Sequence, residues 1–69
     1  MNNKIVAVEP AGCIMTVHDI AIYLRLSEAK VYKLAKEGQL PALRVGKSWR
    51  FRKDLIDEWM RREMEQALH

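Results

Sequence analysis

The sequence has few of the residues that cross-link small proteins or bind metals. It contains one cysteine, Cys13, so no disulfide can form within the chain. Cys13, His18 and His69 do not show the paired spacing of a zinc site. We therefore expect no metal and no cofactor, and we expect Cys13 to be a small filler of the core rather than a reactive thiol.

Long apolar runs and a signal peptide are also missing. A membrane span needs about eighteen or more apolar residues in a row, and the chain has no such run. Glu9 and Pro10 interrupt the apolar N-terminal segment, which excludes the usual form of a signal peptide. These absences predict a cytoplasmic protein with a reduced thiol and no membrane partner.

The residue patterns of common enzymes are absent as well. The sequence shows no nucleophile–base pair, no useful carboxylate dyad and no glycine-rich phosphate loop. A chain of 69 residues makes one domain, which is too small to wall off a catalytic cleft. We predict no catalytic residue and no small-molecule ligand, with a poorly ordered arm over residues 1–12 and one domain over residues 13–69.

Charge is the most informative property that is present. The net charge is +3, but residues 25–53 contain nine Lys and Arg against two acidic residues, for a net charge of +7. The remainder contains three Lys and Arg against seven acidic residues, for a net charge of −4. Such segregation produces a local positive field that suits a polyanion.

A first helix is expected to begin after Thr16. Thr16 is a good N-cap, and Asp19 three residues later approximates a capping box. The pattern leaves His18 and Ile22 on the surface. Apolar residues at helical spacing define the buried face: Val17, Ile20, Ala21 and Leu24.

A second helix is expected over residues 28–37. Ser27 is its predicted N-cap, and Gly38 is its predicted stop because glycine tolerates the left-handed conformation. Val31, Leu34 and Ala35 form its apolar stripe. The opposite side and its flanks hold Ala29, Lys30, Tyr32, Lys33 and Lys36.

Residues 42–52 are expected to form a β-hairpin. A three-residue loop, Gly46 to Ser48, would pair Val45 with Trp49 and Leu43 with Phe51, placing all four apolar side chains on one face. We prefer this register to a two-residue loop. It sets Arg44 opposite Arg50, a repulsive pair that suggests an anionic ligand such as phosphate.

The last helix is expected to begin at Lys53 or Asp54. Its acidic outer face would repel a polyanion, so we expect it to lie at the back of the domain. Its apolar face is predicted to consist of Leu55, Ile56, Trp59, Met60 and Ala67.

Two helices joined by a tight turn, a basic hairpin and a packing helix make a winged helix-turn-helix, mainly α with a small β-hairpin. Residues 16–60, TVHDIAIYLRLSEAKVYKLAKEGQLPALRVGKSWRFRKDLIDEWM, resemble the excisionase and MerR-like winged helix-turn-helix family. The ordered set of matches carries this resemblance: Ala21, Leu26-Ser27, Val31-Tyr32, Glu37-Gly38, Leu40-Pro41, Arg44-Val45-Gly46, Trp49-Arg50-Phe51, Asp54-Leu55 and Trp59.

The sequence departs from the family at two positions. Arg25 stands where glycine is usual, so either Arg25 adopts a left-handed backbone and gains a phosphate contact, or the turn differs. Glu28 stands where a basic residue is common. It either caps the helix, which we favour, or accepts a hydrogen bond from a cytosine amino group.

The resemblance implies a small bacterial or phage protein that binds double-stranded DNA, with helix 28–37 in the major groove and wing 42–52 on the backbone or minor groove. It would act as a transcription regulator or as an excisionase-type architectural factor, associated with the nucleoid when bound. Its partners would include a second copy on adjacent sites, or an integrase. The alternative is a protein-interaction adaptor that keeps the fold.

The DNA-binding residues follow from these placements. In the recognition helix they are Ser27, Ala29, Lys30, Tyr32, Lys33 and Lys36. In the wing they are Arg44, Lys47, Ser48 and Arg50, with Arg25 and Arg52 as further backbone contacts.

Overall fold

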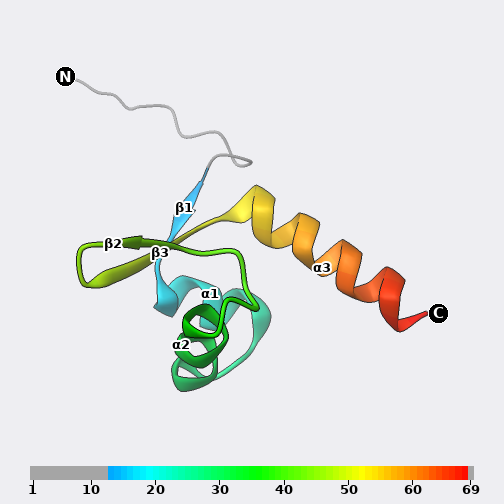
Figure 1. Cartoon of the computed structure of the whole chain (residues 1–69), viewed down its shortest axis with the longest axis horizontal. Helices are drawn as coiled ribbons and strands as arrows, with labels where there is room; N and C mark the ends of the chain where they lie inside the picture. The colour runs from blue at the N-terminus through cyan, green and yellow to red at the C-terminus, as the bar shows by residue number, and fades with distance from the viewer. Residues whose placement is uncertain (1–12, 69) are drawn as a thin grey trace.

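A computed structural model describes residues 13–68, which form three helices and a small antiparallel sheet (Figure 1). The expected arm over residues 1–12 lies outside the described residues. The mainly α architecture with a β-hairpin confirms the predicted winged helix-turn-helix. In chain order the elements are β1 (Ile14–Met15), α1 (Val17–Leu24), α2 (Glu28–Lys36), β2 (Leu43–Val45), β3 (Ser48–Arg52) and α3 (Lys53–Ala67).

Helix α1 starts with the predicted capping box. The Asp19 N–H donates to Thr16 Oγ1 at 3.1 Å, and the Thr16 N–H donates to Asp19 Oδ2 at 2.9 Å. These two bonds satisfy backbone donors that the first turn would otherwise leave without partners. The Thr16 backbone N–H is the largest cause that lowers the pKa of Asp19 below its ordinary value, and the Thr16 side chain is the next.

The turn between α1 and α2 depends on an arginine in a glycine-like conformation. Arg25 has φ 58° and ψ 46°, the left-handed region, and its N–H points back to the carbonyls of Ala21 and Ile22. Of the two alternatives for this turn, Arg25 therefore takes the left-handed one. Ser27 then caps α2 as predicted, its hydroxyl accepting the Lys30 N–H at 3.1 Å.

The predicted hairpin register is wrong. Strands β2 and β3 are joined by the two-residue turn Gly46-Lys47, and Arg44 lies opposite Trp49 rather than opposite Arg50. Gly46 has a φ of 60°, and a two-residue hairpin turn favours glycine at such a position. Leu43 then lies opposite Arg50, and Val45 lies opposite Ser48.

The predicted register assumed that every apolar residue of the hairpin is buried, and this assumption is wrong. Leu43 and Val45 are 64% and 53% exposed, whereas Phe51 is 1% exposed. The hairpin therefore has an inner face, containing Trp49 and Phe51, and an outer face that keeps aliphatic side chains in contact with solvent. Turn geometry, rather than alternation of apolar residues, determines the register.

A short strand ahead of α1 was not predicted. β1 pairs antiparallel with β3, with Ile14 opposite Arg52 and Met15 opposite Phe51, so the sheet order is β1-β3-β2. The Lys53 N–H extends this pairing by donating to the Cys13 carbonyl at 3.0 Å. β3 is thus the central strand, and it runs directly into α3.

One core joins the helices to the inner face of the sheet. It confirms most of the predicted apolar faces of α1 and α2, with Leu24 and Leu34 partly buried at its edge. The predicted face of α3 is only partly correct, because Leu55 is 45% exposed and Ala67 is also exposed. The buried residues are Val17, Ile20, Ala21, Val31, Ala35, Leu40, Phe51 and Ile56.

Polar contacts attach the start of α3 to α1. The Tyr23 hydroxyl donates to Asp57 Oδ1 at 2.5 Å, and Lys53 Nζ lies 3.0 Å from Asp57 Oδ2. These two contacts lower the pKa of Asp57, with the Tyr23 hydrogen bond as the larger cause. Beyond this point α3 extends away from the other elements (Figure 1). Neither α3 nor the other helices of residues 13–68 combine the length and apolar composition of a membrane span.

Candidate nucleic-acid interface

An open groove runs between α2 and the β2–β3 hairpin. Its volume is about 930 Å³, and both elements contribute basic side chains to it. Six of the predicted DNA-binding residues meet in this groove. Its lining residues are Ala29, Tyr32, Lys33, Lys36, Glu37, Arg44, Lys47 and Trp49.

The packing of α2 explains why its residues face the groove. Val31 and Ala35 are buried against the core, with exposed fractions of 0% and 5%. At 3.6 residues per turn, Ala29, Lys33 and Lys36 then lie on the opposite side of the helix. One exposed side of α2 therefore carries two lysines beside a small alanine that leaves room for close approach.

The observed register gives the hairpin a different role from the predicted pair of facing arginines. Arg44 lies opposite Trp49, and its guanidinium carbon is 4.8 Å from the centre of the Trp49 ring. A cation–π contact of this kind orients the arginine without removing its charge. Arg44 is thus held over Trp49 on the face that lines the groove with α2.

A smaller niche of about 240 Å³ adjoins this groove. The two concavities share Tyr32, Lys47 and Trp49. Ser48 and Arg50, two more predicted wing residues, line the niche rather than the groove. The first turns of α1 and α2 close it with Thr16, Val17, His18 and Glu28.

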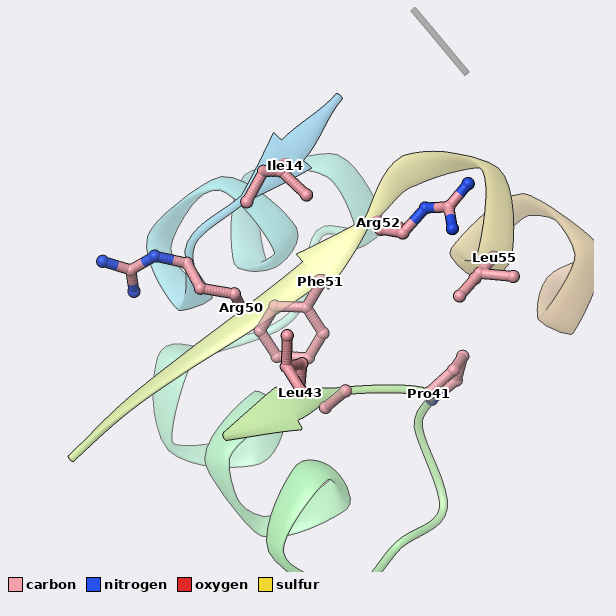
Figure 2. Close-up of a pocket in the computed structure, with 8 residues that line it drawn as sticks. Ile14, Pro41, Leu43, Arg50, Phe51, Arg52 and Leu55 are labelled. Carbon is pink, nitrogen blue, oxygen red and sulfur yellow. The ribbon is translucent and has the colours of Figure 1, made fainter. Parts of the chain in front are cut away.

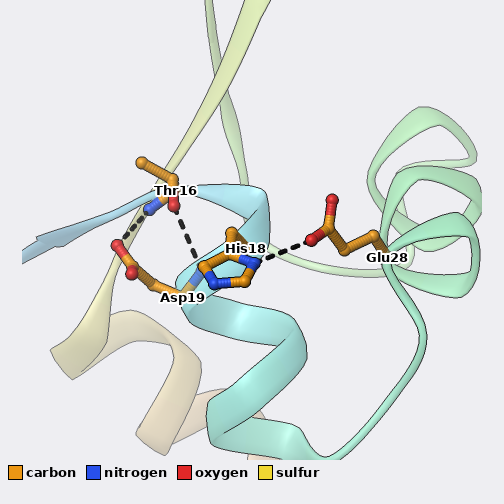
Figure 3. A network of polar contacts seen from close by, with 4 residues as sticks. All are labelled: Thr16, His18, Asp19 and Glu28. Atoms are coloured by element: carbon orange, nitrogen blue, oxygen red, sulfur yellow. Dashed lines mark hydrogen bonds and ion pairs between the residues drawn. The ribbon is translucent and has the colours of Figure 1, made fainter.

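An ion pair connects the two helices in this niche. His18 Nδ1 lies 2.8 Å from Glu28 Oε2, and both side chains are more than half exposed (Figure 3). The hydrogen bond to Glu28 is the largest cause that raises the pKa of His18 above its ordinary 6.5. The exposed His18 was predicted, but the pairing was not, because no spacing in the sequence indicates that these two first turns meet.

Residues 14–64 match the family model described as the helix-turn-helix domain. The chain belongs to the helix-turn-helix domain family.

Two relatives from Mycobacterium tuberculosis are similar to this helix-turn-helix domain. They are named "Putative DNA-binding protein MT0521", from strain CDC 1551, and "Putative DNA-binding protein Rv0500A", from strain H37Rv. Each is 46% identical over 37 residues, which cover 54% of this chain and 47% of the relative. The chain thus spans about half the length of these relatives. No solved structure matches it.

Several predicted site residues of this helix-turn-helix domain lie outside the groove and niche. The Ser27 hydroxyl is engaged in capping α2, and Lys30 lines neither concavity. Arg25 forms the turn between the helices. Arg52 Nη2 lies 2.6 Å from Asp54 Oδ2, at the junction of β3 with α3.

The preferred interpretation of Glu28 as a capping residue also needs correction. Its carboxylate contacts His18, and the capping bond of α2 comes from Ser27. Glu28 is in the first turn, where an acidic side chain still favours the positive end of the helix. The side chain is therefore oriented by α1 rather than by its own helix.

An apolar groove of about 390 Å³ lies on the outer face of the sheet. Figure 2 shows Ile14, Leu43 and Leu55 around it, with the ribbons of α1 and α2 behind the sheet. All three side chains are at least 45% exposed, and Arg50 and Arg52 border the groove. This surface is distinct in position and character from the basic groove.

Within residues 13–68, no group of three His, Cys, Asp or Glu side chains is arranged to hold a metal ion. The side chains of the basic groove and its niche can bind an anionic surface through charge and hydrogen bonds.

Proposed function

We propose that this protein binds double-stranded DNA, with α2 in the major groove and the β2–β3 hairpin on the backbone or minor groove. The observation that carries the proposal is the single groove where lysines of α2 meet Arg44 and Lys47 of the hairpin. A major groove about 12 Å wide admits one helix, and the basic hairpin beside that helix would then lie along the sugar–phosphate backbone.

The distribution of charge supports this orientation. The segment from Arg25 to Lys53 has a net charge of +7 and includes every basic residue of the groove. None of the residues that line the groove comes from α3, whose Arg61 is paired with its own Glu58 and Glu65. A polyanion would therefore approach α2 and the hairpin rather than α3.

In this proposal, different side chains contact different parts of the DNA. Ala29, Lys30 and Lys33 face base edges, and Tyr32 and Lys36 contact phosphate or base. Arg44, Lys47, Ser48 and Arg50 contact the backbone or minor groove, with Ser27, Arg25 and Arg52 as peripheral contacts.

The biological role follows from DNA binding in one of two ways. The protein acts either as a transcription regulator or as an excisionase-type architectural factor, in accord with its resemblance to excisionase and MerR-like proteins. The names of the two relatives from Mycobacterium tuberculosis support DNA binding in either role. A second copy on adjacent sites or an integrase would be the protein partner in the architectural role, and identification of the bound sites would separate the two.

The test compares Lys33→Ala with Arg50→Ala in binding to duplexes selected from a random pool. Lys33→Ala should relax the sequence preference, because a good base contact provides about 1–3 kcal/mol of discrimination. Arg50→Ala should weaken binding to all sequences alike and lower the salt slope by about 1.

Arg62→Ala is the matched control, since it removes one exposed positive charge from α3, outside the groove. It should leave both specificity and affinity close to those of the unmodified protein. Unchanged binding by both the Lys33 and the Arg50 variants at moderate salt would show that the proposed surface is wrong.

The apolar groove on the outer face of the sheet favours a second candidate, an adaptor that binds another protein. The predicted pair of facing arginines, which suggested an anionic ligand rather than an apolar partner, is absent from the observed register, although the +7 segment still argues for DNA. A gel-shift experiment with random duplex at low salt separates the two functions. Absence of a shift at micromolar protein would favour the adaptor.

A further inference from the structure

Glu28 is an unusual residue for its position. Between Arg25 and Lys53 there are only two acidic residues, Glu28 and Glu37, among nine basic ones. Glu28 is the first residue of the helix that is proposed to read DNA, and its side chain is 51% exposed. A carboxylate there repels phosphates, so it lowers affinity for DNA in general.

Helix α2 does not need the Glu28 carboxylate as a cap. The carboxylate is nevertheless held in place by a contact from α1. Ser27 provides the capping bond of α2, whereas Glu28 Oε2 is fixed by His18 Nδ1 of α1 at 2.8 Å. Among the described residues, Glu28 Oε1 has no hydrogen-bond partner. One acceptor oxygen is thus left available at the start of α2, while Figure 3 shows the other oxygen directed at His18.

We propose that Glu28 is a specificity-determining residue that accepts a hydrogen bond from the exocyclic amino group of a base, and that His18 is the residue that positions it. Cytosine is the expected base, because its N4 amino group is the donor that carboxylates read in the major groove. This inference rests on the proposed DNA binding and specifies one contact within it.

The chemistry makes Glu28 a selective residue rather than an attractive one. Opposite an amino group, the free oxygen gains a hydrogen bond to a charged acceptor. Opposite a base that presents only acceptors, the same oxygen is repelled and loses its water. Sequence preference at this position would therefore come mostly from rejection of the wrong base.

Protonated His18 reduces the general cost of this carboxylate. The other charged or titratable groups around the pair are Asp19 on α1, Tyr32 on α2, Lys47 in the hairpin turn and Arg50 on β3. As the pH rises through the raised pKa of His18, the positive charge beside Glu28 is lost. Affinity for DNA should then fall, and the fall should depend on His18.

The experiment determines base preference by selection from a random duplex pool and then measures affinity for single-base variants of the selected site. Glu28→Gln is expected to shift the preference at one base pair from cytosine toward adenine, since glutamine pairs with adenine. The preference of the unmodified protein for cytosine over the other bases at that position, expected to be roughly tenfold, should be lost in Glu28→Gln. The affinity of this variant for random duplex should rise.

Glu63→Gln is the matched control, because it makes the same charge change at an exposed position of α3, outside the groove and the niche. It should leave each base preference intact and change affinity for DNA little. His18→Gln should weaken the preference at the Glu28 position and abolish the change in affinity between about pH 6 and pH 8, a pH profile that a purely structural role would not alter.

The outcomes separate this inference from the proposed function. If the unmodified protein binds no duplex, the proposed function fails, and the inference fails with it. If the protein binds specifically but Glu28→Gln keeps every base preference, only the role of Glu28 is overturned. Melting curves of each variant, compared with those of the unmodified protein, establish that the folded proteins are being compared.

Discussion

Arg25 has a strained backbone conformation in the turn between α1 and α2. Among residues 13–68 it is the only residue other than glycine with a positive φ, at 58°. A side chain in this conformation costs roughly 1–2 kcal/mol, because Cβ crowds the backbone carbonyl. The protein tolerates that cost at a site where glycine would be free of it.

Arg25→Gly should therefore stabilise the domain. Removing the strain should raise the free energy of unfolding by roughly 1–2 kcal/mol. The added conformational freedom of glycine in the unfolded chain should lower it by about 0.5–1 kcal/mol. The net gain of about 0.5–1 kcal/mol should raise the melting temperature by a few degrees, since a domain of this size shifts by roughly 4–8 °C per kcal/mol.

Arg25→Ala is the control for this substitution. It retains the Cβ strain and should give no such increase in melting temperature. A melting temperature that stays the same or falls in Arg25→Gly would mean that the arginine side chain stabilises the turn by more than its backbone strain costs.

Local sequence rules predict single residues well when the deciding contact is close in the chain. Thr16 and Ser27 are N-caps, as predicted, because each hydroxyl needs only a backbone N–H three residues later. His18 and Glu28 are ten residues apart, and only the packing of α1 against α2 brings them together. The chain therefore contained no local signal for the contact on which the role of Glu28 depends.

The capping box gives helix α1 a pH dependence whose sign can be worked out. Hydrogen bonds from the Thr16 N–H and hydroxyl lower the pKa of Asp19 below its ordinary 3.8. A carboxylate with a lowered pKa in the folded state stabilises the protein above its unfolded-state pKa. That contribution is lost as the pH falls through the folded-state pKa.

Asp19→Ala should accordingly lower the melting temperature at pH 7, because the capping box loses both the charge and the bond to Thr16. The difference from the unmodified protein should narrow as the pH falls below the ordinary pKa of 3.8 and through the lower pKa that Asp19 has in the folded protein. Thermal melts followed by circular dichroism between pH 2 and pH 7 provide the measurement. A difference that is constant across this range would exclude an ionic contribution from Asp19.

Elements that project beyond the core are harder to predict than elements that build it. The faces of α1 and α2 follow from helical spacing because both helices are buried on one side. The hairpin register was wrong because Leu43 and Val45 were assumed to be buried, although the hairpin leaves both in solvent. Glycine at the first position of a two-residue turn was the better indicator.

Strand β1 could not be recognised from the sequence. A two-residue strand shows no alternation, and its existence depends on the free edge that β3 provides for Ile14 and Met15. The candidate groove was predictable as a set of residues on α2 and the hairpin. The division of the wing residues between the groove and the niche was not predictable, because it depends on the observed register of the hairpin.

At the scale of the whole molecule, the segregation of charge has a measurable consequence for binding. With roughly four to six phosphate contacts, each contributing about 0.9, the slope of log K against log salt should lie near −4 to −5. Binding measured from about 50 to 300 mM salt tests this value. A slope near zero would mean that the +7 segment does not contact phosphates.

The order of elements made the overall fold predictable from sequence. Two capped helices, a glycine-containing hairpin and a final amphipathic helix pack in few other ways when the chain has 69 residues. The outer face of the sheet was not anticipated, because the predicted register would have buried the aliphatic side chains of β2. Its apolar groove is a direct result of the observed pairing.

The junction of β3 and α3 has a mechanical consequence. Strand β3 ends at Arg52 and α3 begins at Lys53, so no flexible residue separates the wing from the longest helix of the domain. Fifteen helical residues span about 22 Å, so tilting this continuous rod by about 10° at the sheet would swing the far end of α3 by about 4 Å. A small tilt of the hairpin would therefore move the end of α3 by a distance large enough to follow by spectroscopy. One probe near Trp49 and a second near Leu68 would report the change in the distance between them.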